Sequence, residues 1–436
     1  MYGQNLGRAL ARLVTALLAC MWFATGAVSA QGQTGDAHAH EHGADDHDHA
    51  DHDADDHDHE HGDADHADHD HDHDAAGLAG IRLLLGQAGS PRAYVISAED
   101  GAVLGTFSVP GAARVEQLAD TRYGALVHTE ANRVTFVYSG LSAVDHGDHM
   151  DLLLGNPYVL ATVNTGRQPL HLASYGDDIA VFNEADGTVA WFDSRLLGAS
   201  VDYRTVEAAP DHGALVPLGD HIAIGLLSAG TVEVHGGDGK LAATFTGCGS
   251  VHGQALLDDQ AVFGCANGVM LVRELAGGVF TADLLPNPGT AQDARVSSLV
   301  STGAERYVVG NYGNGFAVID PAARTFVAYE AEGTQLGGVL FDGGERFARL
   351  GSDGRLRSFD LASGAQLGSV AVTDELGQGA PRPAITSVGD LAFVTYPNAR
   401  AVVVVDLDGM TIADRLELDF RPDGIALLRL PGAVLH

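Results

Sequence analysis

Basic residues are scarce in this chain of 436 residues, and their scarcity limits its partners. The sequence has 24 Lys and Arg against 58 Asp and Glu, a formal net charge of −34. A tract at residues 36–74 contributes 17 of these acidic residues, and the rest of the chain is acidic as well. Nucleic acids and anionic membrane surfaces bind basic proteins, so nucleic acids are excluded as partners and anionic membranes are disfavoured.

Tryptophan is rare too, with two residues in the whole chain. This disfavours a quinoprotein-like dehydrogenase, whose repeats are rich in tryptophan. The sequence also lacks a P-loop, a Gly-x-Ser-x-Gly nucleophile elbow and a His-Glu-x-x-His zinc motif. We therefore expect a protein that is not an enzyme, and a metal-dependent periplasmic enzyme is kept as an alternative.

Long apolar segments are lacking, because the run at residues 13–28 is too short for a membrane span and polar residues soon follow it. Two arginines precede this run, and a small-residue cleavage site ends it. These features predict a signal peptide at residues 1–30 and a periplasmic mature chain that is not inserted in the membrane. Lipid attachment at Cys20 is the alternative.

Cysteine is almost absent from the mature chain, which retains only Cys248 and Cys265. An even pair of cysteines in an oxidising compartment favours a structural disulfide. Metal ligation by the two thiolates is the alternative, and it is disfavoured because free thiols tend to oxidise in the periplasm.

What the chain does have is a tract of His, Asp, Glu, Ala and Gly at residues 36–74, without aromatic or basic residues. Neutral imidazoles beside carboxylates suit a borderline divalent cation such as Zn²⁺, although Cu²⁺ and Ni²⁺ accept the same ligands. We expect residues 31–77 to form a disordered metal-binding tail with many weak sites. Its candidate ligands are His38, His40, His42, His47, His49, His52, His57, His59, His61, His66, His69, His71 and His73.

Residues 78–436 repeat a hairpin pattern. Short apolar runs are joined by turns such as Asp100-Gly101 and Asp408-Gly409, with four predicted strands in each unit of about 40 residues. This pattern predicts an all-β fold, a β-propeller. We expect eight blades, with seven as the alternative, and a C-terminal strand at residues 421–428 that completes the first blade. Further blades should open near residues 114, 169, 211, 251, 295, 335 and 383.

Three histidines follow the period of this repeat. His171, His212 and His252 are each separated from the next by one repeat length, and each opens a predicted innermost strand. They should converge at one mouth of the central channel as a tris-His metal site, with Asp211 or water as a further ligand. His128 should lie on the same face as another candidate. The alternative is that one or two of these histidines only form hydrogen bonds to strand ends. The disulfide should brace the loop of His252.

A second candidate metal site lies in one predicted loop, residues 144–151. His146, His149 and Asp151 resemble the HxxHxH motif of streptococcal histidine-triad zinc proteins, with Asp in place of the last His. The connectivity puts this loop on the face opposite the channel histidines. A solvated acidic loop without metal is the alternative.

The signal peptide, the tract from His38 to His73, the propeller and the His146-Gly147-Asp148-His149 loop occur in an order that resembles the periplasmic zinc metallochaperones of the AztD family. The resemblance covers essentially the whole chain. It implies that captured Zn²⁺ is passed to the solute-binding protein of a zinc ABC transporter, and we expect a monomer. The alternative is a propeller scaffold for interactions, with a tail that only buffers metal.

Overall fold

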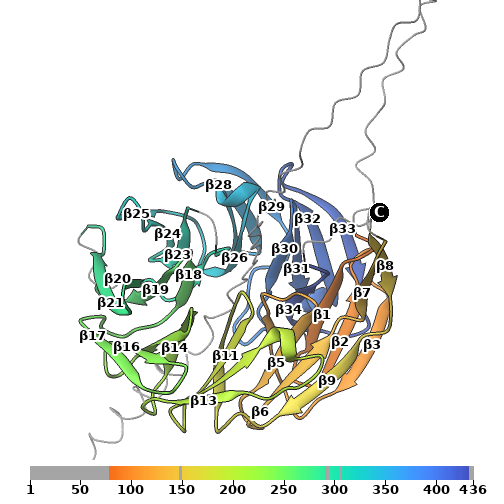
Figure 1. The fold of residues 1–436 in the computed structure, drawn as a ribbon. Coiled ribbons are helices and arrows are strands. Elements are labelled where there is room, and N and C mark those ends of the chain that lie inside the picture. The colour runs from red at the N-terminus through yellow and green to blue at the C-terminus, as the bar shows by residue number, and fades with distance from the viewer. Residues whose placement is uncertain (1–77, 147–149, 290–293, 304–305, 432–436) are drawn as a thin grey trace, which may run out of the picture.

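Four-stranded antiparallel sheets repeat eight times around a central channel (Figure 1). The structure is a computed structural model that describes residues 78–146, 150–289, 294–303 and 306–431. The predicted signal peptide and tail therefore lie outside the described residues. The prediction of an all-β, eight-bladed propeller is confirmed, and the alternative of seven blades is excluded.

We number the sheets as blades 1 to 8. The strands of each blade are given from the innermost outwards. Blade 1 contains β34 (Pro422–Leu428), β1 (Arg82–Gln87), β2 (Arg92–Ser97) and β3 (Val103–Ser108), and blade 2 contains β4 (Arg114–Gln117), β5 (Tyr123–His128), β6 (Arg133–Tyr138) and β9 (Tyr158–Val163). Blade 3 contains β10 (Pro169–Tyr175), β11 (Asp178–Asn183), β12 (Thr188–Asp193) and β13 (Arg204–Glu207), and blade 4 contains β14 (Gly213–Leu218), β15 (His221–Leu226), β16 (Thr231–Gly236) and β17 (Leu241–Thr246).

Blades 5 to 8 follow in the same order. Blade 5 contains β18 (Gln254–Leu257), β19 (Gln260–Cys265), β20 (Gly268–Leu275) and β21 (Val279–Pro286), and blade 6 contains β22 (Leu299–Val300), β23 (Val308–Tyr312), β24 (Gly315–Asp320) and β25 (Thr325–Tyr329). Blade 7 contains β26 (Gln335–Phe341), β27 (Arg346–Gly351), β28 (Arg355–Asp360) and β29 (Gln366–Ala371), and blade 8 contains β30 (Ile385–Val388), β31 (Leu391–Tyr396), β32 (Ala401–Asp406) and β33 (Thr411–Glu417).

The ring is closed by β34, as the sequence predicted. This strand follows all other described strands in the chain, yet it pairs with β1, with Leu428 opposite Arg82. Blade 1 therefore joins the two ends of the described chain. All strands of the ring lie within residues 82–428, so its hydrogen bonding is complete without the segment that precedes Leu78.

The core lies between neighbouring blades. The second and third strands of most blades are buried over nearly their whole length, as in β11 and β12, whereas outer strands such as β3 and β17 alternate between exposed and half-buried residues. This difference follows from the position of an outer strand, which has solvent on one side. In the predicted Asp100-Gly101 turn, Gly101 has a φ of +73°, whereas in the Asp408-Gly409 turn the positive φ falls on Met410.

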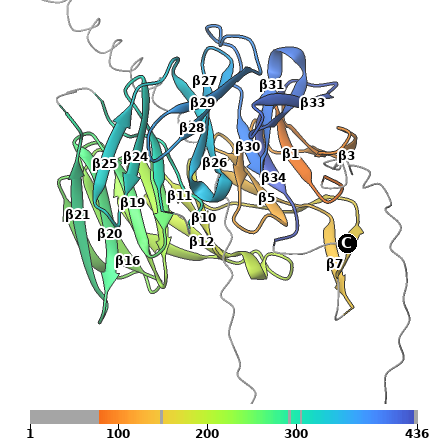
Figure 2. The same ribbon diagram turned by 90° about the horizontal axis from the view of Figure 1, so that it is seen from above.

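Blade 2 contains an insertion between its third and fourth strands. Where the sequence predicted a loop, the structure has a separate two-stranded hairpin, β7 (Leu141–Asp145) and β8 (Met150–Leu154). This hairpin projects from the ring (Figure 2). Apolar residues in the loop segment, such as Val144 and Leu152, gave a strand pattern too short to identify from the sequence.

Helical segments in the described residues are single 3₁₀ turns, η2 (Ser194–Leu196), η3 (Asp342–Gly344) and η4 (Pro397–Ala399). A helix with the length and apolar character to cross a membrane is not found in the described ranges.

Candidate metal centre

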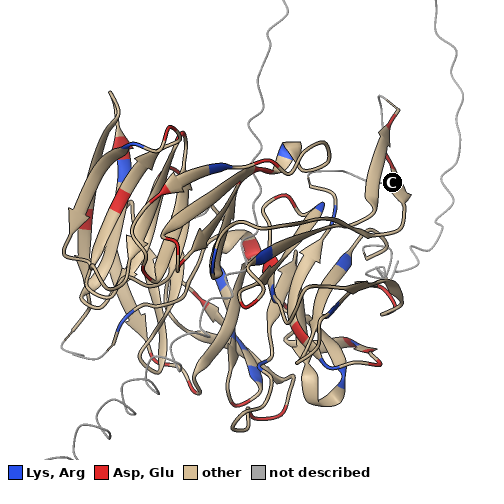
Figure 3. Ribbon diagram, turned by 90° about the horizontal axis from the view of Figure 1, so that it is seen from below, with Lys and Arg blue, Asp and Glu red and all other residues tan. Residues whose placement is uncertain are grey.

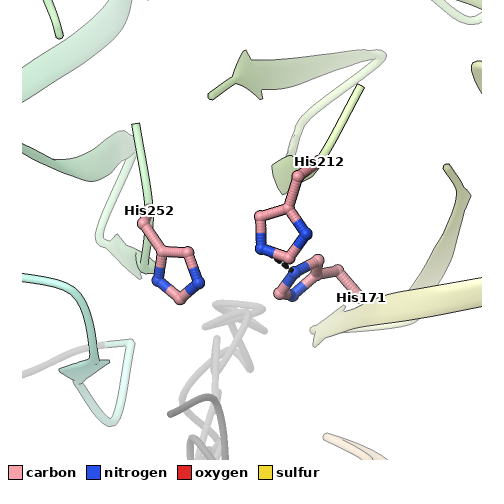
Figure 4. Close-up of side chains that lie close together, drawn as sticks. All are labelled: His171, His212 and His252. Carbon is pink, nitrogen blue, oxygen red and sulfur yellow. Dashed lines mark hydrogen bonds between the residues drawn. The ribbon is translucent and has the colours of Figure 1, made fainter. Parts of the chain in front are cut away.

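Three consecutive blades each bring one histidine to the same mouth of the channel. His171 is the third residue of β10, while His212 and His252 come immediately or shortly before β14 and β18. The prediction that the three side chains converge is met, because their candidate ligand nitrogens all lie within 4.8 Å of one another (Figure 4). Ligation of metal by these residues remains a proposal.

Local packing fixes the position of His212. The next residue, Gly213, has no side chain, and a Cβ there would lie 2.6 Å from the Phe182 ring of the preceding blade. Glycine therefore lets the start of β14 pack directly on that ring. His171 and His252 are almost fully buried, and the His212 side chain is 20% exposed. The cluster is thus accessible to solvent mainly through His212.

The imidazole rings are arranged for ligand atoms to share one small space. The Nε2 atoms of His171 and His212 are 3.1 Å apart, and the rings of His212 and His252 are stacked with centroids 5.1 Å apart. Two imidazole nitrogens bound tetrahedrally to zinc at 2.0–2.1 Å are separated by about 3.3 Å. The pair His171 and His212 is therefore already near the spacing that a shared zinc ion requires.

His252 has its ring orientation set by the backbone. Its Nδ1 lies 2.7 Å from the carbonyl oxygen of Ser297, which can only accept a hydrogen bond. Nδ1 therefore donates its proton, and Nε2 keeps the lone pair that a metal needs. A histidine ligand usually has such a partner on its other nitrogen, because that contact fixes the tautomer and ring orientation.

Glu184 gives His212 a comparable neighbour, and sequence reasoning missed it. It lies in the turn between β11 and β12, and its Oε1 is 2.7 Å from Nδ1 of His212 and 3.7 Å from Nε2 of His171. The contact with His212 has an ion-pair distance, but its angles are not those of a regular hydrogen bond, since Oε1 is buried without such a partner. The negative charge of this carboxylate would partly balance the positive charge of a cation bound in the cluster.

Burial keeps two rings of the cluster, His171 and His252, uncharged. Desolvation lowers the pKa of His171 well below its usual range, and the neighbouring His212, Arg114 and His252 lower it further. Desolvation is also the main reason that the pKa of His252 falls to about 4, against the opposing effect of its bond to Ser297. Both rings are therefore neutral at pH 7, the form that binds metal.

A cavity of about 40 Å³ lies beside His171 in the channel, and Arg114, Glu116 and Gln254 contribute to its lining. One water needs about 10–15 Å³ of such volume, so the cavity has room for water next to the cluster. Three imidazoles and an adjacent cavity with room for water suit a zinc ion with three protein ligands and one exchangeable position.

His128 does not join this cluster, which corrects the expectation from the sequence. It lies at the end of β5 with no solvent exposure, and its two ring nitrogens contact the Gly111 carbonyl oxygen at 3.1 Å and Thr135 Oγ1 at 3.0 Å. Both nitrogens are used within its own part of blade 2. His128 is therefore a buried, hydrogen-bonded core residue.

Asp211 also differs from the expectation, because its carboxylate organises the backbone. Its oxygens accept hydrogen bonds from the backbone N–H groups of His212, Ser228 and Ala229. These contacts join the segment before β14 to the turn between β15 and β16. Asp211 thus holds the His212 segment in place and is not among the clustered candidate ligands.

The second predicted site is described only in part. His146 and Asp151 lie at the free end of the β7–β8 hairpin, with His146 Nε2 at 3.1 Å from Asp151 Oδ2. His149 lies outside the described residues, as do the thirteen histidines of the predicted tail. Metal binding by the hairpin and by the tail stays a prediction.

The predicted disulfide is present between Cys248 and Cys265, whose Cα atoms are 4.9 Å apart. It connects the segment between β17 and β18 to the end of β19, and both half-cystines are fully buried. His252 follows Cys248 by four residues, so the bond restrains the segment that presents this histidine. Thiolate ligation of metal is thereby excluded for this pair.

No protein-family model matches the sequence. A curated relative, the zinc chaperone AztD of Citrobacter koseri, is 26% identical over 385 residues, which cover 81% of this chain and 87% of the relative. The resemblance to AztD inferred from the sequence is therefore confirmed.

Solved structures of AztD are similar to this chain in fold. The structure of apo AztD from Citrobacter koseri superposes with a TM-score of 0.73 at 23% identity, covering 80% of this chain and 97% of that one. A second crystal structure of Citrobacter koseri AztD gives a TM-score of 0.74 at 23% identity, covering 82% and 99%.

Proposed function

We propose that this protein is a periplasmic zinc chaperone that holds Zn²⁺ at His171, His212 and His252 and passes it to a partner protein. The observation that carries the proposal is the convergence of three imidazoles from consecutive blades, of which burial keeps His171 and His252 neutral. Similarity to a protein named as a zinc chaperone supports zinc as the cargo. The partner, on the resemblance found in the sequence, is the solute-binding protein of a zinc ABC transporter.

The site suits transfer as well as capture. Three histidines leave one coordination position of zinc for water or for a ligand of the partner. His212 is the most exposed of the three and lies closest to Glu184, so an incoming ligand would first meet zinc on that side. Exchange through a shared intermediate lets a tightly held ion leave without being released into solution. The proposed tail would collect zinc in weaker sites and supply this one.

Zinc titration of the ring without its tail tests this function. Residues 78–436 contain every strand of the ring, and we expect them to bind one zinc ion at the channel mouth. His212→Ala should abolish that binding, whereas His128→Gln should leave it intact because His128 lies in the core. Loss of all tight binding on removal of the tail would instead favour the passive scaffold with a metal-buffering tail.

Transfer to a partner needs its own measurement. Zinc-loaded protein is mixed with the apo solute-binding protein and an excess of a chelator, and the metal on the recipient is counted. A chaperone should load the recipient faster than zinc dissociates into the chelator alone. Equal rates would mean that the protein only stores zinc.

A further inference from the structure

His252, the third histidine of the channel cluster, has a neutral partner on its outer nitrogen. Charged residues of both signs occur around the ring (Figure 3), and His212 has the carboxylate of Glu184 beside its Nδ1. The Nδ1 of His252 instead lies 2.7 Å from the carbonyl oxygen of Ser297. A neutral acceptor binds an N–H group less strongly than a carboxylate does, so the position of this carbonyl matters for the histidine.

The carbonyl that orients His252 comes from the next blade. Ser297 precedes β22, the innermost strand of blade 6, whereas His252 precedes β18 in blade 5. The two segments approach closely at Gly253, which has a φ of +84° and where a Cβ would lie 2.8 Å from the carbonyl carbon of Ser297. A residue with a side chain would push the segments apart. The orientation of the His252 ring therefore depends on how blade 6 holds Ser297.

Asn311 holds the Ser297 segment on its other side. It lies in β23, the second strand of blade 6, and its Oδ1 accepts hydrogen bonds from the backbone N–H groups of Ser297 at 3.0 Å and Ser298 at 2.7 Å. Its Nδ2 donates to Ser297 Oγ at 3.0 Å. Because two N–H donors converge on one atom, that atom must be the amide oxygen, and this fixes the direction of the Asn311 side chain.

A single peptide unit connects Asn311 to His252. The carbonyl group of Ser297 and the N–H group of Ser298 belong to one trans peptide and point in opposite directions. The N–H group donates to Asn311 Oδ1, and the carbonyl oxygen accepts from His252 Nδ1, each at 2.7 Å. Hydrogen bonds in such a chain polarise one another. Asn311 thus directs this carbonyl toward His252 and strengthens its bond to the Nδ1 proton.

We propose that Asn311 is a positioning residue for the zinc site, which acts through this peptide to keep His252 in the tautomer whose Nε2 can bind metal. The inference rests on the proposed zinc-chaperone function and adds to it a residue from a blade that supplies no histidine to the cluster. Without Asn311 the peptide can turn away, and the proton of His252 can move to Nε2. Zinc affinity then falls, because one of the three nitrogens no longer offers its lone pair.

The test uses the full mature chain and Zn²⁺, and chelator competition measures the tight site that His212→Ala removes. Asn311→Ala removes the contacts to the peptide, whereas Asn311→Asp keeps the shape of the side chain and its acceptor oxygen. The matched control is Thr395→Val in blade 8, because Thr395 Oγ1 accepts a hydrogen bond at 2.8 Å from the backbone N–H of Ala384. Thr395 likewise holds the segment before an innermost strand, β30, but this blade has no clustered histidine.

Asn311→Ala should weaken zinc binding at least about tenfold, as expected when the outer partner of a metal ligand is lost. Asn311→Asp should bind zinc as tightly as the parent chain, since a carboxylate accepts N–H bonds at least as well as an amide. Thr395→Val should also match the parent. Equal losses of affinity in Asn311→Ala and Thr395→Val, or an Asn311→Asp variant as weak as Asn311→Ala, would overturn the inference.

Nitrogen-15 NMR of the histidine side chains gives a readout that a general loss of stability would not mimic. In the metal-free parent, His252 should carry its proton on Nδ1, and Asn311→Ala should shift the population toward the Nε2 tautomer. His252→Gln identifies the signal. An unchanged tautomer in Asn311→Ala would contradict the proposal.

A measurement on the parent chain keeps the proposal testable if Asn311→Ala does not fold. Zinc binding polarises the His252 ring, so it should shift the amide signal of Ser298, which lies in the same hydrogen-bonded chain. The amide of Ala384 in blade 8 should not move. A Ser298 signal that does not respond to zinc would mean that Asn311 is not coupled to the metal.

Failure of this inference can be told apart from failure of the proposed function. The tautomer of His252 is measured without zinc, so it reports the action of Asn311 independently of metal binding. If His212→Ala abolishes tight zinc binding while Asn311→Ala changes neither affinity nor tautomer, only the role of Asn311 is wrong. If His212→Ala removes no zinc, the channel site itself is wrong, and the inference is wrong with it.

Discussion

The Nε2 atoms of His171 and His212 face each other across 3.1 Å, from the innermost strands of neighbouring blades. Two imidazole lone pairs at this distance repel each other, so either one nitrogen carries a proton or a cation lies between them. Without metal, one neutral ring can meet this need by carrying its proton on Nε2 and donating it to the other, and a zinc ion would replace that hydrogen bond with two Nε2 ligands.

Glu184→Gln tests the carboxylate beside this pair. Replacing it should lower zinc affinity by roughly 10–100-fold, because His212 loses the negative charge next to its Nδ1. Competition with a chromophoric chelator measures the change. Glu130 lies exposed in the equivalent turn of blade 2, so Glu130→Gln is the matched control and should bind zinc as the parent does. Equal affinity of both variants would remove Glu184 from the site.

Asp211→Ala separates a structural role from ligation. The variant loses three backbone hydrogen bonds near His212, and we expect a stability loss of about 1–3 kcal/mol by urea unfolding. Zinc should still bind with a stoichiometry of one in the isolated ring. A full loss of zinc with unchanged stability would restore Asp211 as a ligand.

Removal of the disulfide should affect both stability and zinc binding. The bond closes a loop with a sequence separation of 17, and its loss in a Cys248→Ala, Cys265→Ala double variant should lower stability by about 3 kcal/mol. Zinc affinity should also fall, since the segment carrying His252 loses its anchor. Thermal unfolding measures the change in stability, and chelator competition measures the change in zinc affinity. Reduced stability with unchanged affinity would show that the bond does not position His252.

Acid should destabilise the metal-free protein through His252. The folded pKa is about 4, while the unfolded value is about 6.5, so between these pH values the unfolded chain binds a proton that the folded chain does not. Stability should therefore fall as pH drops below 6.5, by at most about 1.4 kcal/mol per pH unit from this residue. His171 acts in the same direction.

Urea unfolding in the presence of a chelator at pH 7, 6 and 5 measures this dependence. His252→Gln lacks the titrating group, and its stability should depend less steeply on pH than that of the parent chain. Parallel curves for the two proteins would mean that His252 is protonated equally in the folded and unfolded states.

The sequence predicted the fold well because propeller blades leave a periodic pattern. The predicted opening near residue 169 coincides with the start of β10, and the predicted closing strand coincides with β34. The spacing of His171, His212 and His252 by one blade was sufficient to place them together. Period and connectivity determine which face a residue occupies, and these were visible in the sequence.

The direction in which each side chain points could not be predicted from the sequence. His128 was assigned to the correct blade end, but its ring turns inward to Thr135 and Gly111. Glu184 was overlooked because an acidic residue in an Asn-Glu-Ala-Asp-Gly segment looks like an ordinary turn residue. The connectivity did contain a signal, since the turn between second and third strands shares a face with the start of the innermost strand. Applying that rule to every acidic turn residue would have found it.

The pairing of β34 with β1 also determines when the protein can acquire its final shape. During synthesis, β1 emerges before every other strand of the ring, and its partner β34 emerges after all of them. Until residues 422–428 follow, the inner edge of β1 has no hydrogen-bonding neighbour and the circle remains open, which leaves it exposed to aggregation and proteolysis. A chain that ends before this point keeps the inner edge of β1 exposed, because only a chain that extends through β34 can pair with it.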